Sequence, residues 1–454
     1  MKQILITGDR SGSGKTSITL ALAALLTKKH RVQTFKVGMD YIDPSYLSAV
    51  SGRPCRNLDS FALSDVKIRD IFQYGCRGAD MALVEGVRGL YEGAEALTDV
   101  GSTAAIAKTL DLPVILVVSA QSITRSSAAI VRGFQSFDPQ VRIAGVILNN
   151  TRGGSHRAKA TTAIEHYCGV PVIGAIPRME EMQLAMRHLG LVPYREGSGR
   201  GDFDARIDTI TEMIGQYVDL DRFVSLMKEC DMPHATSPAF DSSPKRDVKV
   251  GIALDEAFNF YYADLFDILH ALGAEYIPFS PIHDRLPEAD GYIIGGGYPE
   301  LFIRELEANT PMREALKEVS GNGVPVYAEC GGLMYLAREI DWDGEWHDMV
   351  DLVPGSVRKG QIRVVSYISG TLSRDCLLGP TGSRLLGHEF HHSELVMDEK
   401  EKVEYAIKLD RGTGIEGGFD GVVENNMLAS YSHLHAASYR GFPSKFLLTC
   451  TRAK

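Results

Sequence analysis

The stretch GDRSGSGKTS at residues 8–17 follows a strand-like apolar run at 3–7 and precedes a long apolar helical pattern at 16–28. In that context the glycines let backbone N–H groups converge on phosphate oxygens, and the helix N-terminus adds partial positive charge. Lys15 is expected to reach the β- and γ-phosphates, and the Thr16 hydroxyl to bind Mg²⁺. The sequence therefore predicts a P-loop that binds ATP through Gly12, Ser13, Gly14, Lys15, Thr16 and Ser17.

Strand-like runs alternate with helix-length segments on both sides of this loop. In the first half the runs lie at 3–7, 32–37, 81–84, 114–118, 144–148 and 172–176. Such alternation indicates a parallel sheet covered by helices on both faces. Residues 230–247 are rich in Pro, Ser and Asp, and a second α/β series follows with runs at 248–253, 292–294 and 325–328. We therefore predict an α/β protein with domains at 1–229 and 248–454 and a linker at 230–247.

Composition excludes several classes of protein. The 454 residues are 44% hydrophobic and 23% charged, and no run approaches the roughly 18 apolar residues of a membrane span. A net charge of −10 argues against nucleic acid as a partner. Seven scattered cysteines, none in a C-x-x-C pair, argue against disulfides and a zinc site. The first residues lack the apolar segment of a secretion signal, so we expect a cytoplasmic protein without a membrane partner.

Carboxylates at the ends of two strand-like runs are candidate Mg²⁺ ligands beside Thr16. Glu85 ends one run, and Asp40 and Asp43 follow another. Mg²⁺ prefers such hard oxygen ligands, so we predict a site of Thr16, Asp43 and Glu85. For Asp40 and Asp43 the alternative is an Asx-turn before Pro44, and the sequence leaves open which of the two carboxylates contacts the ion.

Cys330 lies in PVYAECGGLM at 325–334, between an apolar strand pattern and a helix. A turn of this kind exposes the sulfur, and a helix N-terminus stabilises the thiolate, so Cys330 is a candidate nucleophile. Its candidate base is His433 in ASYSHLH at 429–435, although His435 would share its direction on a strand. We expect the other histidine group, His388, His391 and His392, to be surface or interdomain residues rather than metal ligands.

Acyl transfer to a cysteine nucleophile passes through an oxyanion, which needs unobstructed backbone N–H groups. Gly296 and Gly297, in the glycine run GGGYPE at 295–300, follow a strand-like run and are the candidates for supplying them.

The segments GSGKTS, FKVGMDYIDPSY, NLDSF, LVEGVRGLYEG and VPVIGAIPR resemble the cobyrinic acid a,c-diamide synthase family, in order along the first half. The five residues between Gly8 and Gly14 are similar to the longer P-loop of dethiobiotin synthetase relatives. Cys330 and the Ser-Tyr-x-His pattern at 430–433 resemble class I glutamine amidotransferase domains of the cobyric acid synthase type. The resemblance implies that glutamine supplies ammonia, and that ATP activates acetate carboxylates of a tetrapyrrole as acyl-phosphates.

Several short sequence segments resemble the sirohydrochlorin-amidating enzymes of methanogenic archaea more than the cobyrinate enzymes. They are Met39, Tyr46-Leu47, GVRGLYEG at 86–93 and SITRS at 122–126. This resemblance implies nickel sirohydrochlorin as substrate, with cobyrinic acid as the alternative. A P-loop regulatory or partitioning ATPase with an inactive amidotransferase-like module is the alternative from another class. The oligomeric state stays open, with a homodimer as one alternative. The expected polycarboxylate-binding residues are Lys36, Asp40, Tyr46, Arg88 and Arg125.

Overall fold

The computed structural model describes residues 1–179, 186–187, 190–191, 194, 201–230, 238–243, 246–398 and 403–453. The chain divides into two compact units, Met1–Ser237 and Pro238–Lys454. Residues 231–237 and 244–245 of the expected linker lie outside the described residues. The domain limits at 229 and 248 therefore stay a prediction.

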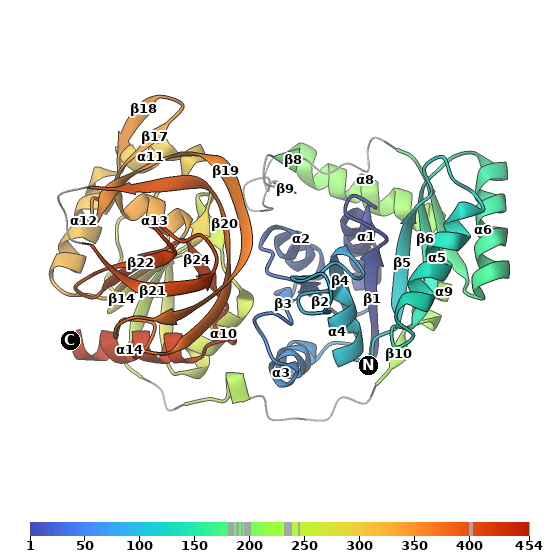
Figure 1. Cartoon of the computed structure of the whole chain (residues 1–454), viewed down its shortest axis with the longest axis horizontal. Helices are drawn as coiled ribbons and strands as arrows, with labels where there is room; N and C mark the ends of the chain where they lie inside the picture. The colour runs from blue at the N-terminus through green and yellow to red at the C-terminus, as the bar shows by residue number, and fades with distance from the viewer. Residues whose placement is uncertain are drawn as a thin grey trace. The chain divides into compact units, whose positions relative to one another are not determined.

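The first unit is built on a sheet in the order β3-β2-β4-β1-β5-β6-β7, in which neighbouring strands are parallel (Figure 1). β10 (Lys228–Glu229) pairs antiparallel with β1. The strands are β1 (Lys2–Gly8), β2 (Val32–Val37), β3 (Arg56–Leu58), β4 (Met81–Gly89), β5 (Val114–Ser119), β6 (Ile143–Thr151) and β7 (Val172–Pro177).

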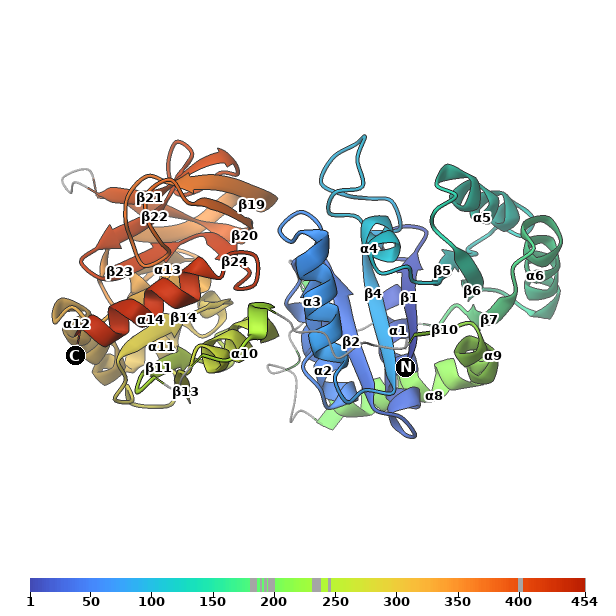
Figure 2. The same cartoon turned by 90° about the horizontal axis from the view of Figure 1, so that it is seen from below.

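Helices cover both faces of this sheet, as Figures 1 and 2 show. α1 packs against α2 and α8, α3 against α4, and α5 against α6. The helices are α1 (Lys15–Thr27), α2 (Ile42–Ser51), α3 (Asp65–Cys76), α4 (Thr103–Thr109), α5 (Ser126–Phe137), α6 (Gly154–Cys168), α8 (Gly201–Tyr217) and α9 (Leu220–Ser225). Parallel strands buried on both faces explain why the runs that form them are almost wholly apolar.

The register of the first sheet sets up its carboxyl edge. Lys36 on β2 is paired with Glu85 on β4, and Glu85 is also paired with Ile6 on β1. Two charged side chains therefore lie level with each other on adjacent strands, near the end of β1 and the loop that follows it. β4 continues to Gly89, so Glu85 lies within its strand and not at its end as expected. Open α/β sheets bind ligands at this edge.

The second unit combines parallel and antiparallel strands in one sheet. β13, β11, β14, β16 and β23 are parallel neighbours, and β22, β21, β19, β17, β18, β20 and β24 complete the sheet. The parallel strands are β11 (Lys249–Ala253), β13 (Glu275–Phe279), β14 (Gly291–Ile294), β16 (Val326–Glu329) and β23 (Met427–Ser430). The others are β17 (Ala337–Trp342), β18 (Glu345–Asp348), β19 (Val353–Leu372), β20 (Arg384–Met397), β21 (Glu404–Arg411), β22 (Phe419–Glu424) and β24 (Ser432–Leu434).

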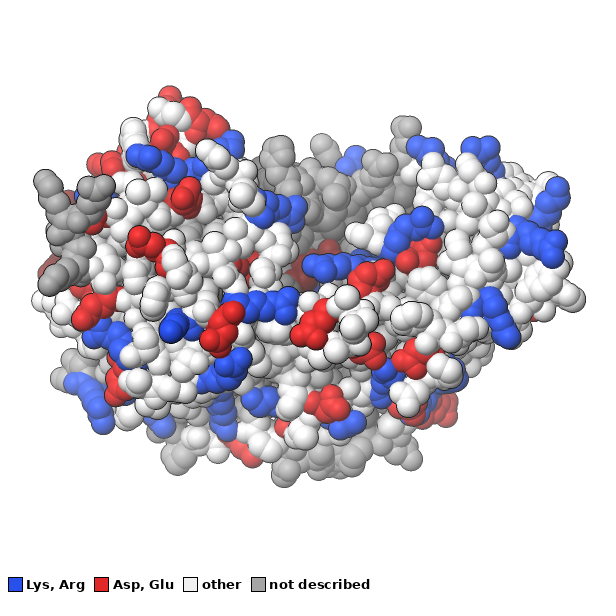
Figure 3. Space-filling view, viewed as in Figure 1, with Lys and Arg blue, Asp and Glu red and all other residues white. Residues whose placement is uncertain are grey.

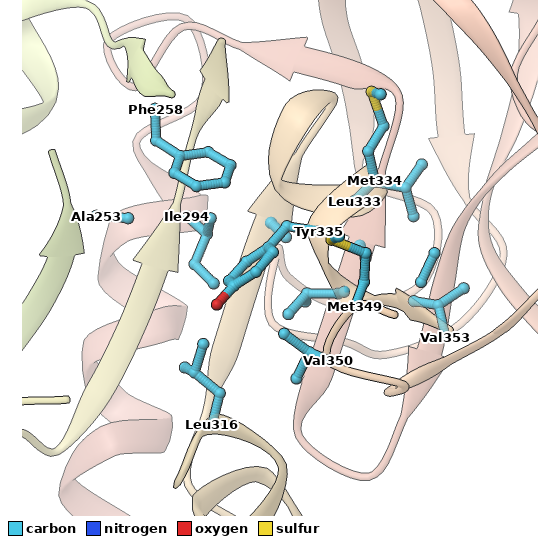
Figure 4. Close-up of a cluster of buried hydrophobic side chains, with 14 of the residues drawn as sticks. Ala253, Phe258, Ile294, Leu316, Leu333, Met334, Tyr335, Met349, Val350 and Val353 are labelled. Carbon is cyan, nitrogen blue, oxygen red and sulfur yellow. The ribbon is translucent and has the colours of Figure 1, made fainter. Parts of the chain in front are cut away.

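A separate ribbon of β12 (Phe258–Phe260) and β15 (Gly296–Gly297) lies in the same unit. Its helices are α10 (Ala263–Ala271), α11 (Ile303–Ala308), α12 (Thr310–Gly321), α13 (Gly331–Leu336) and α14 (Gly441–Ala453). Tyr335 of α13 is fully buried and packs its ring 5.4 Å from that of Phe258. Figure 4 shows Tyr335 surrounded by Ile294, Leu316, Met349 and Val350 of the same cluster. This core holds α13 against β16.

The α/β class and the two strand-rich halves predicted from the sequence are confirmed. The large antiparallel part of the second sheet was not predicted. Its longest strand, β19, is largely half-buried or exposed, so it lacks the uniform apolar signal of the parallel strands. Acidic and basic side chains are mixed over the face drawn in Figure 3. Among the described residues, no helix is long and apolar enough to cross a membrane.

Candidate functional site

The P-loop between β1 and α1 is held in a glycine-dependent conformation. Gly12 and Gly14 have φ of 78° and 92°, in the left-handed region that favours glycine. A Cβ on Gly14 would lie 2.2 Å from Nδ2 of Asn149, which donates a 2.8 Å hydrogen bond to the carbonyl of Ser13. Asn149 thus fixes the loop from β6. Asn149 was not predicted as a site residue, although a polar residue at the end of an apolar strand pattern could have marked it.

Five charged or hydroxyl side chains meet beside this loop: four were expected at the nucleotide site, and the fifth, Lys36, was expected to bind the polycarboxylate substrate. Thr16 Oγ1 donates to Glu85 Oε1 at 2.7 Å and lies 3.3 Å from Asp43 Oδ2. Nζ of Lys36 donates to Asp43 Oδ2 at 2.5 Å and to Glu85 Oε1 at 2.8 Å. Lys15 Nζ stands 3.8 Å from Glu85 Oε1. The sheet edge and the P-loop therefore form one compact charged cluster.

Burial and charge act in opposite directions on the two lysines. Lys36 is 1% exposed, and burial alone lowers its pKa, but the carboxylates of Asp43 and Glu85 raise the pKa well above its ordinary value. Burial and then the charge of Lys36 lower the pKa of Lys15. Lys36 therefore stays protonated. For Lys15, the nearby carboxylates do not fully offset the effect of burial on its pKa. A polyphosphate beside Lys15 would supply the missing negative charge.

Asp40 and Asp43 have different roles in the local structure. Asp40 Oδ1 accepts hydrogen bonds from the backbone N–H of Ile42 at 2.8 Å and of Asp43 at 3.2 Å, which is the Asx-turn at the start of α2. Burial and the neighbouring Asp43 raise the pKa of Asp40 to about 6. Burial also opposes ionisation of Asp43, but Lys36 and Lys15 lower its pKa below the ordinary value. Asp43 is thus the carboxylate that faces Thr16.

The structure separates the other expected substrate residues. Lys36 belongs to the buried cluster, and Tyr46 is 0% exposed within α2 with its ring 5.9 Å from that of Tyr194. Tyr46 therefore packs inside the unit, and its role in binding the substrate stays a prediction. Arg88 is exposed at the end of β4 with φ of 52°. Arg125 is exposed before α5 and donates to the hydroxyl of Tyr167 at 2.9 Å.

In the second unit, Cys330 occupies a strained turn between β16 and α13. Its φ of 49° and ψ of −101° are rare for a non-glycine residue, and such strain is concentrated at functional sites. The side chain is 4% exposed, and Sγ donates to the carbonyl of Phe390 at 3.4 Å. The backbone N–H of Cys330 donates to Ser430 at 2.7 Å. The expected nucleophile elbow is therefore present, although its helix, α13, has only six residues.

His433 lies beside Cys330 and next to a carboxylate that the sequence analysis missed. Nδ1 of His433 is 3.5 Å from Oε2 of Glu329, the residue that precedes Cys330. Burial lowers the pKa of His433, but interactions with Cys330 and Glu329, hydrogen bonds included, raise it to about 10. The structure thus brings together the two residues expected to act as nucleophile and base.

The glycines expected to bind the oxyanion lie next to His433 and next to the turn that carries Cys330. A Cβ on Gly296 would lie 2.6 Å from Cε1 of His433, and one on Gly297 would lie 1.9 Å from the carbonyl of Ala257. The backbone nitrogen of Gly297 is 3.0 Å from the Cβ position of Gly331. Only glycine fits here, and the N–H groups of this loop lie beside the turn that carries Cys330.

The expectation for the remaining histidines was wrong in part. His388 and His391 are not surface residues: both are buried, and their rings stack on His433 at 4.8 Å and on Tyr431 at 3.9 Å. Burial lowers the pKa of His391 to about 4. His435 does not share the direction of His433, because β24 ends at Leu434 and its Nε2 instead lies 3.2 Å from Asp264. His392 is half-buried.

Comparisons with known proteins cover both units. Residues 4–192 match the CobQ/CobB/MinD/ParA nucleotide binding domain, and residues 249–441 match the CobB/CobQ-like glutamine amidotransferase domain. A solved structure described as a glutamine amidotransferase is 16% identical and covers 44% of this chain and 98% of its own, but its TM-score of 0.32 is too low to add to the fold assignment.

Three relatives match nearly the whole chain, and each bears the name cobyrinate a,c-diamide synthase. The protein of Methanosarcina acetivorans is 52% identical over 96% of this chain and 93% of its own. Those of Methanosarcina barkeri and Methanocaldococcus jannaschii are 51% and 42% identical, each over 98% of this chain and over 95% and 99% of their own. This chain therefore belongs to the cobyrinate a,c-diamide synthase family, and it is a carbon–nitrogen ligase that uses glutamine as its amido donor.

Proposed function

We propose that this protein uses ATP and glutamine to amidate the a and c acetate carboxylates of nickel sirohydrochlorin. The observation that carries the proposal is that one chain holds a complete phosphate-binding cluster around Lys15 and Lys36 and a Cys330–His433 pair. The first makes a carboxylate electrophilic, and the second releases ammonia. The P-loop regulatory ATPase with an inactive module does not account for the paired Cys330 and His433.

In the first unit a substrate carboxylate oxygen attacks the γ-phosphorus of ATP, and the bond to ADP breaks, which gives an acyl-phosphate. Ammonia then attacks the acyl carbon, phosphate leaves, and a proton is lost to give the primary amide. Lys15 and the P-loop N–H groups stabilise negative charge on the transferred phosphoryl group. The Lys36 ammonium group lies 2.8 Å from Oε1 of Glu85. Its positive charge offsets the charge of the nearby carboxylates, which would otherwise repel the ATP phosphates.

Mg²⁺ fits the oxygen atoms beside the P-loop. The Thr16 hydroxyl lies 3.3 Å from Oδ2 of Asp43 and 2.7 Å from Oε1 of Glu85, so two carboxylates and a hydroxyl meet there. Oε2 of Glu85 is buried and accepts no hydrogen bond within the described residues. Mg²⁺ in phosphoryl-transfer sites is held by one or two carboxylates together with phosphate oxygens and water. When bound there, the ion would offset charge on the ATP phosphates, while Thr16, Asp43 and Glu85 would hold it.

In the second unit Cys330 attacks the side-chain amide carbon of glutamine. His433 takes the thiol proton and later donates a proton to the departing ammonia, and water then cleaves the thioester to glutamate. N–H groups near Gly296 and Gly297 would receive the oxyanion. Because the chemistry needs ATP and a reduced thiol at Cys330, we also propose that the protein acts in the cytoplasm.

The choice of nickel sirohydrochlorin as substrate rests on the short sequence segments around Met39, Arg88 and Arg125. The names of the relatives favour a second candidate, cobyrinic acid. Incubation of the protein with each compound, ATP, Mg²⁺ and glutamine, followed by mass measurement, distinguishes the two. We expect two successive amide products from nickel sirohydrochlorin, at a kcat/KM at least about tenfold above that for cobyrinic acid. The reverse preference would establish the second candidate.

A further inference from the structure

Glu329 is placed between the nucleophile and the base of the second unit. It ends β16 immediately before Cys330, and its side chain is nine-tenths buried. Oε1 accepts a 2.6 Å hydrogen bond from the hydroxyl of Tyr327 and a 3.0 Å bond from the backbone N–H of Leu434. Oε2 is left to face Nδ1 of His433 at 3.5 Å. One oxygen is thus held by a residue of the same strand, β16, and by the backbone of β24, and the other faces the imidazole.

We propose that Glu329 is the positioning residue of His433 and completes a Cys330–His433–Glu329 triad. By accepting from Nδ1, the carboxylate holds the ring in the tautomer and orientation in which Nε2 exchanges the proton with Cys330. It also stabilises the imidazolium formed when the thiolate is generated. The inference rests on the proposed roles of Cys330 and His433 and adds the third group that orients the base.

Glu329 comes before Cys330 in the sequence, and no carboxylate stands two residues beyond His433. That position is His435, which contacts other groups. Nδ1 of His435 accepts from the N–H of Ala437 at 3.2 Å, and its Nε2 lies 3.2 Å from Oδ2 of Asp264. His435 therefore contacts local backbone and another carboxylate, and Glu329 is the carboxylate that the fold delivers to His433.

The groups that face His433 account for its protonation. Cys330 and Glu329 face it from β16 and the following turn, and both raise its pKa. From β20, His388 stacks on it at 4.8 Å, and burial lowers the pKa of His388 far enough that this ring stays neutral. His391, on the same strand, is also kept neutral by burial. Glu329 is therefore the anionic partner of His433 that persists when Cys330 is a neutral thiol.

The test compares Glu329→Gln with Glu329→Asp and a matched control, Glu307→Gln. Gln keeps the size and an acceptor for the Leu434 N–H but removes the charge, and Asp keeps the charge on a shorter side chain. Glu307 is the control because it also holds a histidine, with Oε2 2.7 Å from Nδ1 of His347 and Oε1 accepting from the N–H of Asp348 at 3.0 Å. Each variant is assayed in the full chain for glutaminase activity, for amidation with ammonium, and for the pH dependence of Cys330 alkylation by iodoacetamide.

For Glu329→Gln we expect glutaminase kcat to fall at least about tenfold, with normal ammonium-driven amidation. The alkaline limb of the glutaminase profile and the pH profile of Cys330 alkylation should both change by about one pH unit or more, because the imidazolium loses a stabilising charge. Glu329→Asp should recover part of the activity and keep the wild-type profile, and Glu307→Gln should behave as wild type.

Unchanged pH profiles in a folded Glu329→Gln variant would overturn the triad even if kcat falls, since a purely structural role leaves them in place. A Cys330→Ser variant separates the two levels of inference. If it retains glutaminase activity, the proposed active site itself is wrong. If it is inactive while Glu329→Gln has wild-type kcat and profiles, only the role of Glu329 is wrong.

Discussion

The Thr16 hydroxyl donates a 2.7 Å hydrogen bond to Oε1 of Glu85, although the two residues are 69 positions apart in the sequence. Thr16 is the second residue of α1, at the end of the P-loop, and Glu85 lies on β4, the neighbour of β1. Glu85 is also fully buried, and its Oε1 lies 2.8 Å from Nζ of Lys36 and 3.8 Å from Nζ of Lys15. The contact therefore joins the phosphate-binding loop to the carboxylate expected to hold its metal ion.

We predict that Lys15→Ala and Glu85→Ala each abolish ATP-dependent product but spare most basal glutaminase turnover. Lys15 neutralises phosphate charge in the transition state, and Glu85 holds Mg²⁺ directly or through water. Product mass and released glutamate are measured side by side over a Mg²⁺ titration. Lys28→Ala, at the exposed end of the same helix, is the control and should retain both activities. Near-normal synthetase rates for Glu85→Ala at limiting Mg²⁺ would contradict the ligand assignment.

Cys330→Ser is expected to abolish glutamine-driven amidation and to leave amidation with high ammonium intact. The nucleophile and the P-loop lie in different units, so loss of the thiol removes the ammonia source alone. Amide formation is measured with glutamine and with ammonium chloride, and Cys230→Ser serves as the control. Loss of both activities in a folded Cys330→Ser protein would argue against separate sites.

Most of the parallel strands were predictable because a buried strand reads as an apolar run, which is a local signal. Their ends were harder to predict: β4 continues through Glu85 to Gly89, and β3 and β13 were not predicted. The role of Glu329 was not predictable in this way, since its partner His433 lies 104 positions further on and its contact depends on the pairing of β16 with β23. The burial of His388 likewise depends on the antiparallel pairing of β20 with β24.

Asp420 should be a determinant of stability in the second unit. It is fully buried and accepts hydrogen bonds from the backbone N–H groups of Gly421, Tyr431 and Ser432 and from the Ser432 hydroxyl. Asp420→Ala would leave these donors unsatisfied beside His433. We expect a loss of about 2–4 kcal/mol in the free energy of unfolding, measured with urea, together with reduced glutaminase activity.

Asp410→Ala is the control for that measurement, because Asp410 forms an exposed ion pair with Arg384. Its removal should change the free energy of unfolding by less than about 1 kcal/mol. Equal effects of the two substitutions would mean that the hydrogen bonds to Asp420 are not needed for the fold.

The raised pKa of His433 predicts how stability depends on pH. The folded-state pKa is about 10, above the ordinary value of 6.5, so the folded protein binds this proton more tightly than the unfolded chain. The stabilisation is complete below about pH 6.5 and is lost as pH rises toward 10. Urea unfolding between pH 6 and 10 should show a smaller decline for His433→Asn than for wild type. Parallel declines would place the His433 pKa near its ordinary value.

The last prediction concerns recognition of the tetrapyrrole carboxylates. Arg88 is exposed on β4, one residue before that strand ends, and Arg125 is exposed immediately before α5, beyond the end of β5. Both therefore lie toward the carboxyl ends of parallel strands. A guanidinium binds a carboxylate through two parallel hydrogen bonds, and a protein of net charge −10 needs such local cations to bind a polyanion. We therefore expect Arg88→Met and Arg125→Met each to raise the tetrapyrrole KM at least about tenfold, the effect of one lost charge-assisted contact of roughly 1.5 to 3 kcal/mol.

The KM values for ATP and glutamine should barely change in these variants, because neither arginine belongs to the Lys15 cluster or to the Cys330 site. Arg125 already donates to Tyr167, so Tyr167→Phe shows whether that contact holds the guanidinium in its binding position. Steady-state kinetics with nickel sirohydrochlorin provide the measurement. Unchanged tetrapyrrole KM in both arginine variants would place the binding pocket elsewhere, since each arginine was assigned on charge and on its place at the same sheet edge.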